Sequence, residues 1–162
     1  MVKIKVENIN RESRYRTEVN QWQSTQSALE WFNKIKDPKS YTFVKFDIVS
    51  FYPSINPNLI KNAIQFAKSI DGIVIPEADE KMILQCRKSF LFCDQQPWTK
   101  TGQENFDVPM GSYDGAEICE LVGLYLLHML TDGEDPIFEK EKVGLYRDDR
   151  LALIKLNQGG RG

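Results

Sequence analysis

The chain has few of the residues that build sulfur- and nitrogen-based reactive centres. Its 162 residues include one histidine and three cysteines, Cys86, Cys93 and Cys119, none of them in a CxxC pair. Scattered cysteines in odd number are typical of buried reduced thiols, whereas zinc sites and disulfide frameworks need clustered or paired ones. The lone His128 has no ligand partner beside it and is interpreted as a structural residue near a helix end.

Long apolar runs and a strong charge of one sign are also missing. No window approaches about 18 uninterrupted apolar residues and the first residues lack the apolar core of a secretory signal, so we expect an intracellular protein, of nucleus or cytoplasm, with no membrane partner. The net charge of −2 offers no general attraction to a phosphate backbone. With 41% hydrophobic and 27% charged residues, the composition fits one folded domain.

Both ends of the chain differ from the middle. Residues 1–19 are interpreted as a basic arm, and a solvated terminus is favoured over a phosphate-contacting one. Residues 156–162 are predicted to be a disordered tail, which leaves 20–155 as the folded domain. The interpretation of residues 1–19 as basic depends on an excess of positive side chains over negative ones. The positive residues are Lys3, Lys5, Arg11, Arg14 and Arg16, and the negative ones are Glu7 and Glu12.

Local signals predict helices and strands along this domain. Ser24 predicts the N-cap of a helix to about Lys36, and Asn56 followed by Pro57 predicts the start of a helix to about Ile70. Further helices are expected at 76–88 and 113–130, and strands at 90–92, 98–100, 143–146 and 151–154, besides the strand that holds Asp47 and is ended by Pro53. The helix at 113–130 is expected to bury Ile118, Leu121, Val122, Tyr125, Leu126 and Met129, and an uncovered apolar face there would allow self-association.

Acidic side chains stand at the ends of apolar, strand-prone runs. Asp47 closes the run that begins at Phe43, and Asp148 and Asp149 lie between the two strands of the predicted C-terminal hairpin. Carboxylates on adjacent strands can hold two divalent ions about 3.5–4 Å apart, the arrangement used in nucleotidyl transfer. Taken singly, each motif is equally typical of a strand end or an ordinary acidic turn.

Three segments together resemble the sequence motifs of a known enzyme family. Residues 43–55, 108–115 and 144–149 are similar, in order, to motifs A, B and C of the reverse transcriptases, and most resemble those of eukaryotic retroelements such as the Penelope-like elements. The resemblance implies an α+β polymerase palm, an antiparallel sheet backed by helices. It also implies Mg²⁺, with Mn²⁺ as a substitute, a primer on an RNA or DNA template, and deoxynucleoside triphosphates.

Site roles follow from the resemblance position by position. It implies catalytic roles for Asp47, Asp148 and Asp149, the first two as metal ligands, and a primer contact for Tyr146. The implied nucleotide-binding residues are Phe51, Tyr52, Met110 and Gly111, with Tyr52 as the gate that excludes a 2′-hydroxyl and Gly111 as a point of close backbone approach. Core packing is the alternative for both tyrosines, and a plain turn for Gly111.

The chain also departs from the family. The fingers and thumb are largely absent from these residues, and Arg150 stands where the family usually has a small residue. We therefore expect a truncated palm with little or no polymerisation by itself. A palm without fingers and thumb loses much of the binding energy that positions its substrates. The alternatives are a noncatalytic interaction or structural remnant of a retroelement palm and a DNA-templated polymerase palm, although the family B polymerases differ in the second and third motifs.

Overall fold

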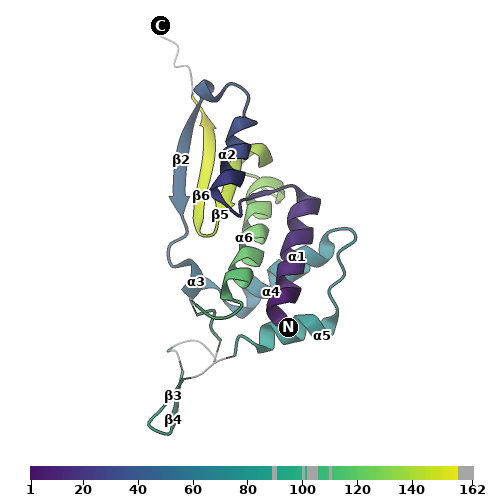
Figure 1. Ribbon diagram of the computed structural model, residues 1–162, viewed down its shortest axis with the longest axis vertical. Coiled ribbons are helices and arrows are strands. Elements are labelled where there is room, and N and C mark those ends of the chain that lie inside the picture. The colour runs from purple at the N-terminus through teal and green to yellow at the C-terminus, as the bar shows by residue number, and fades with distance from the viewer. Residues whose placement is uncertain (89–90, 100, 102–105, 110, 157–162) are drawn as a thin grey trace.

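The computed structural model describes residues 1–88, 91–99, 101, 106–109 and 111–156, which form an α+β fold (Figure 1). Four strands make one sheet in the order β1-β5-β6-β2. Their bounds are β1 (Asn20–Gln21), β2 (Tyr41–Asp47), β5 (Val143–Tyr146) and β6 (Asp149–Lys155). A separate hairpin of β3 (Leu91–Cys93) and β4 (Gln96–Trp98) projects from the body of the molecule.

Helices cover both faces of the sheet. On one face lies α2 (Thr25–Asn33), and on the other lies α6 (Gly115–Asp132), against which α1 (Val2–Thr17) and α4 (Pro57–Ser69) pack (Figure 1). Next to α1 and α4 lies α5 (Glu77–Gln85). The short elements are α3 (Phe51–Ser54), η1 (Pro38–Ser40) and η2 (Lys140–Lys142).

The predicted helix starts are confirmed by their caps. The Ser24 hydroxyl accepts from the Ser27 N–H and the Ser27 hydroxyl accepts from the Ser24 N–H, a reciprocal capping box at α2. Asn56 Oδ1 accepts from the Leu59 N–H at 2.9 Å, with Pro57 in the first turn of α4. The first helix ends at Asn33, three residues before the predicted boundary, and the second ends at Ser69, one residue before it.

The core forms on both sides of the sheet because strand side chains alternate. Val143, Leu145 and Ala152 face α6 and pack with its Leu124 and Leu127. Leu153 faces α2 instead and forms a cluster with Trp22 and Trp31, whose ring centroids are 4.8 Å apart. Of the predicted buried side of α6, Met129 is 44% exposed, because the sheet covers a neighbouring stripe of the helix. The predicted strands at 90–92 and 98–100 are shifted inward, and Phe90 and Lys100 lie outside the described residues.

The sheet is mixed, so the expectation of an antiparallel sheet is only partly correct. The pairs β2·β6 and β5·β6 are antiparallel, but β1 runs parallel to β5. The two residues of β1 are polar, and their sequence does not predict a strand. Side-chain hydrogen bonds hold β1 beside β5, since Asn20 Nδ2 donates to the carbonyls of Lys140 and Val143 at 2.8 and 3.0 Å.

The interpretation of residues 1–19 as a solvated arm is wrong. Residues 2–17 form α1, whose Val6, Asn10 and Ser13 are fully buried, and Asn10 Nδ2 donates to the Glu117 carbonyl at 2.9 Å. Most of its basic side chains form ion pairs instead of an open positive surface, for example Arg14 with Glu120 at 3.2 Å.

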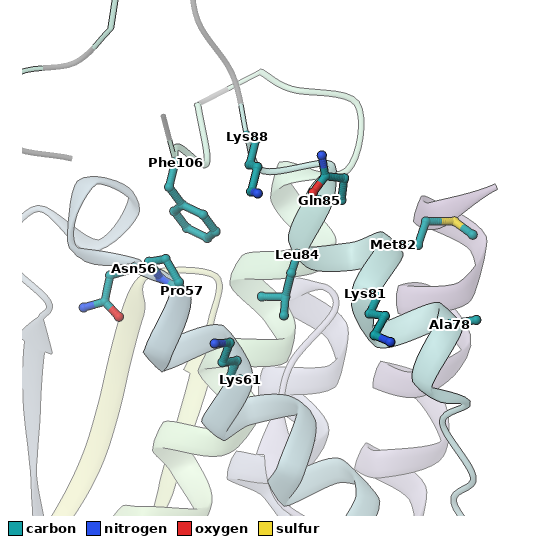
Figure 2. Close-up of a pocket in the computed structure, with 10 residues that line it drawn as sticks. All are labelled: Asn56, Pro57, Lys61, Ala78, Lys81, Met82, Leu84, Gln85, Lys88 and Phe106. Atoms are coloured by element: carbon teal, nitrogen blue, oxygen red, sulfur yellow. The ribbon is translucent and has the colours of Figure 1, made fainter. Parts of the chain in front are cut away.

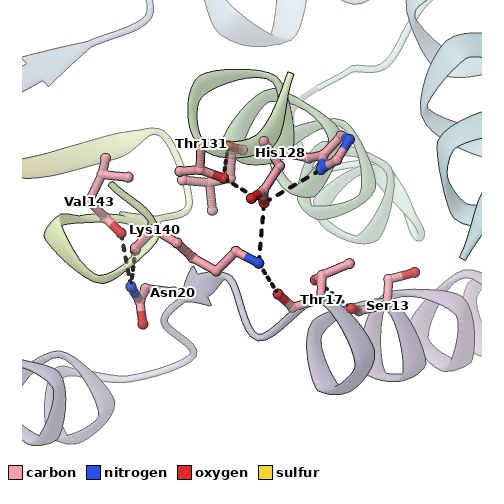
Figure 3. A network of polar contacts seen from close by, with 9 residues as sticks. Ser13, Thr17, Asn20, His128, Thr131, Lys140 and Val143 are labelled. Atoms are coloured by element: carbon pink, nitrogen blue, oxygen red, sulfur yellow. Dashed lines mark hydrogen bonds and ion pairs between the residues drawn. The ribbon is translucent and has the colours of Figure 1, made fainter. Parts of the chain in front are cut away.

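A polar network fastens the end of α1 to the ends of α6 and η2 (Figure 3). Lys140 Nζ donates to the Thr17 carbonyl at 3.0 Å and lies 3.2 Å from Asp132 Oδ2. Burial acts to raise the pKa of Asp132, but hydrogen bonds from Thr131 and Lys140 outweigh it and hold that pKa below its ordinary value. His128 stacks on Phe66 and lies 3.7 Å from Asp132, in keeping with a structural role.

Candidate active site

The register of the sheet brings the three candidate carboxylates to one edge. Asp47 is the last residue of β2 and pairs with Asp149, the first residue of β6. Tyr146 also pairs with Asp149, so Arg147 and Asp148 are the two residues of the β5–β6 turn. This edge lies beside α3 (Figure 1). Asp47 and the pair Asp148 and Asp149, which are distant in sequence, therefore lie at the same edge of the sheet.

All three carboxylates are exposed, and one of them already has a cationic partner. Lys45 Nζ lies 2.8 Å from Asp149 Oδ1. The hydrogen bond to Asp149, reinforced by its charge and by those of Asp47 and Asp148, raises the pKa of Lys45. Lys45 is two residues before Asp47, so both side chains project from the same face of β2. The two-residue spacing of Lys45 and Asp47 is the sequence signal from which Lys45 could have been predicted to lie beside the carboxylates.

Arg150 supplies a second cation from below. Its side chain is buried at 2% exposure, and its Cζ lies 5.8 Å from the centre of the Phe51 ring. Burial lowers the pKa of Arg150 to about 10, and the charges of Asp47 and Asp148 act in the opposite direction. The guanidinium is therefore within electrostatic reach of both predicted metal ligands.

Tyr52 and Phe51 differ in what they offer to a ligand. Phe51 is 5% exposed and packs in the core, so it supports the site from beneath and presents little surface to a nucleotide. Tyr52 is half-buried and packs against the core cluster that contains the buried Cys119 of α6. Burial raises the pKa of both groups to about 12, so both are neutral at physiological pH.

Tyr146 and Gly111, two further predicted site residues, lie in different surroundings. Tyr146 is half-buried on the α2 side of the sheet, with Arg147 Cζ 5.5 Å from its ring centre. Gly111 is exposed with φ at 88°, a backbone conformation that favours glycine, and open space surrounds the position of a Cβ. Met110, also predicted to bind the nucleotide, lies outside the described residues.

A buried ion pair that the sequence analysis missed holds the start of α6. Arg87, just after α5, pairs with Asp114, the residue before Gly115, and their side chains are 5% and 7% exposed. The Arg87 carbonyl also accepts from the Asp107 N–H at 2.9 Å. Two ordinary charged residues far apart in sequence carry no local signal that they will pair.

A pocket of about 990 Å³ lies between α4 and α5 (Figure 2). Leu84, Met82 and Phe106 contribute apolar surface, and none of the described residues that line it carries a carboxylate. The pocket is lined by Asn56, Pro57, Lys61, Ala78, Lys81, Met82, Leu84, Gln85, Lys88 and Phe106. It is thus a cationic and apolar surface distinct from the carboxylate edge.

Three further findings bear on the candidate functions. Among the described residues, no group of three or more His, Cys, Asp or Glu side chains is placed to hold a metal ion. No helix in the described part of the chain is both long and apolar enough to cross a membrane. Comparison with protein-family models, with curated proteins and with solved structures gave no match.

Proposed function

We propose that this chain is a palm of the reverse-transcriptase type, which transfers nucleotides to a primer and is weak or inactive by itself. One observation carries the proposal: the pairing of Asp47 with Asp149, with Asp148 in the adjoining two-residue turn, gathers the acids of two resembling motifs at one exposed edge. Gly115, the last residue of the second resembling segment, begins α6, which packs under the same sheet.

The donor set suits Mg²⁺ bound together with a nucleotide. Mg²⁺ is commonly held by one or two carboxylates, waters and substrate phosphates instead of an all-protein cage. Asp47 and Asp148 are exposed oxygen donors without an ion-pair partner among the described salt bridges, whereas Asp149 is engaged by Lys45. When bound, the metal would lower the pKa of the attacking hydroxyl and neutralise charge on the leaving group.

Other residues would orient the substrates. Tyr52, packed against the core at Cys119, would lie against the incoming sugar and exclude a 2′-hydroxyl, and Tyr146 would support the primer end. Lys61, Lys81 and Lys88 give the pocket of Figure 2 positive charge over apolar surface, a combination that suits the backbone and bases of a single strand. We assign this pocket to the template.

A noncatalytic palm remnant is the second candidate, and the cations at the site favour it. Lys45 and the buried Arg150 offset much of the negative charge that would attract divalent ions. In that case the fold would serve as an interaction surface, and its carboxylates would neither bind a metal nor take part in catalysis.

Primer extension on an RNA template, in Mg²⁺ and then in Mn²⁺, tests the proposal. We expect slow extension that is lost in Asp148→Asn and retained in Asp135→Asn, a matched change at an exposed carboxylate beyond the end of α6. Circular dichroism would establish that all three proteins are folded. If the folded wild-type chain shows neither extension nor Asp148-dependent Mn²⁺ binding in the presence of a deoxynucleoside triphosphate, the hypothesis of a noncatalytic palm remnant is correct.

A further inference from the structure

The hairpin of β3 and β4 presents large apolar side chains to solvent. Leu91, Phe92 and Trp98 are 76%, 68% and 61% exposed, and the residues of the two strands carry no charge. In the β3·β4 register Leu91 pairs with Trp98, so both lie on one face of the hairpin, and Phe92 lies on the other. Every residue from 91 to 99 is exposed. Packing in the core therefore does not account for these side chains.

The hairpin extends from the rim of the pocket in Figure 2. Lys88 and Phe106, which both line that pocket, form an antiparallel bridge, and the hairpin lies in the chain between them. Leu91 is three residues after Lys88, so their Cα atoms are at most about 11 Å apart. Trp98 lies opposite Leu91, and this step adds about 5 Å. The Cα of Trp98 is therefore within about 16 Å of the Cα of Lys88.

The pocket and the hairpin offer two different kinds of contact to a ligand. Lys61 and Lys88 line the pocket and supply positive charge for a phosphate backbone. The uncharged hairpin supplies the exposed indole of Trp98, whose face can stack on an unpaired base. Stacked nucleotides of one strand are about 3.4 Å apart, so about five of them would reach from Lys88 to Trp98. Lysines along the backbone and an aromatic ring under the bases together suit a single strand.

A second copy of the chain fits this hairpin less well than a nucleic acid does. Trp98 can bury about 250 Å² at most, and with Leu91 beside it one face of the hairpin offers less than about 500 Å². A stable protein interface needs about 800 Å² from each partner. Stacking does not need such an area, because one aromatic ring on one base changes affinity by about five- to a hundredfold.

We propose that the β3–β4 hairpin is a stacking platform, on which Trp98 holds an unpaired base of a single-stranded nucleic acid whose backbone passes over the lysines of the pocket. The inference rests on the proposed function in that this strand is the template. Leu91 widens the apolar surface beside the indole. Because every base has a face that can stack, the platform accepts any sequence. It excludes a duplex, whose bases are already paired and stacked.

The test measures RNA binding in two ways. Anisotropy of labelled RNA gives the affinity, and tryptophan fluorescence reports on Trp98, since Trp22 and Trp31 are only 7% exposed. The probes are oligoadenylate and oligouridylate of about 12 nucleotides, a length within the site sizes of single-strand-binding folds, and a duplex of the same length. The variants are Trp98→Leu, which keeps an apolar side chain, and Trp98→Phe, which keeps an aromatic one. Tyr15→Leu is the control, at a residue 80% exposed near the end of α1 that lies away from the hairpin (Figure 1).

We expect both single strands to quench the exposed fluorescence of the wild-type protein and the duplex to have little effect. Trp98→Leu should bind single strands at least about fivefold more weakly. Its slope of log affinity against log salt should equal that of wild type, because the substitution removes no charge. Trp98→Phe should retain most of the affinity, and Tyr15→Leu should bind as wild type does.

Three results would overturn the inference in different ways. If Lys61→Ala weakens RNA binding but Trp98 is not quenched and Trp98→Leu binds as wild type does, the template pocket stands and the platform is wrong. If sedimentation shows a dimer that Trp98→Leu converts to a monomer, the hairpin is a contact between copies of the chain. If no single strand binds, the template assignment is wrong as well, and Asp148-dependent primer extension tests the rest of the proposed function separately.

Discussion

Breaking the buried pair of Arg87 and Asp114 should weaken the whole fold. Both side chains are almost fully buried, so removing one partner leaves a charge without compensation in a poorly solvated place. The typical cost is about 3–5 kcal/mol. A domain of this kind has a total stability of about 5–15 kcal/mol. Asp114→Asn should therefore remove a large share of this stability. The Asp114 side chain makes no cap hydrogen bond to α6, so the loss of such a bond does not contribute to the measured change.

Urea unfolding of Asp114→Asn, Arg87→Met and the double variant measures their free energies of unfolding. The comparison separates the cost of leaving one buried charge unpaired from the interaction energy of the ion pair. We expect the double variant to be more stable than the sum of the two single losses predicts, by about 0.5–3 kcal/mol of coupling. Glu77→Gln, which breaks the exposed Glu77–Lys81 pair on α5, serves as the control and should cost less than about 1 kcal/mol. Purely additive losses, or a loss in Asp114→Asn as small as the control's, would refute this reasoning.

Three further changes have definite expected outcomes. Asp132→Asn should lower the free energy of unfolding at pH 7 by about 0.5 kcal/mol through loss of the exposed contact with Lys140. Since the pKa of Asp132 is lowered in the folded protein, this contribution is present above the ordinary value of 3.8 and is lost as the pH falls below it. Gly144→Ala should cost about 2–3 kcal/mol, because its Cβ would overlap the Trp22 ring. Lys61→Ala should reduce the slope of log affinity for single-stranded RNA against log salt by about 0.7.

Each of these outcomes has its own measurement. Urea titrations between pH 7 and pH 3 follow Asp132→Asn, and a difference from wild type that persists at the lowest pH would contradict the assignment. For Gly144→Ala, an unchanged thermal midpoint would show that the Trp22 ring can move aside. Lys39→Ala, at an exposed lysine on η1 outside the pocket, is the control for RNA binding, and an equal change in slope there would mean that Lys61 has no special place.

Local signals were sufficient for most helices and for the hairpin. The capping residues Ser24 and Asn56 act within a few residues of themselves, so their consequences can be predicted without the rest of the fold. The spacing of Val2, Val6 and Ile9 could also have indicated α1, but the buried face of that helix is completed by Asn10 and Ser13. Polar residues on an inward face are normally interpreted as exposed, and only packing against α6 shows otherwise.

The sequence by itself determined the α+β composition, the strand that carries Asp47, the hairpin that carries Asp148 and Asp149, and the order of the segments that resemble reverse transcriptase motifs. Tertiary structure decided that these carboxylates meet, because the β2·β6 register is set by side chains on both faces of the sheet. It also decided the burial of Arg150 and the pairing of Arg87 with Asp114. Those features depend on contacts between residues distant in the chain, whose identity no local pattern encodes.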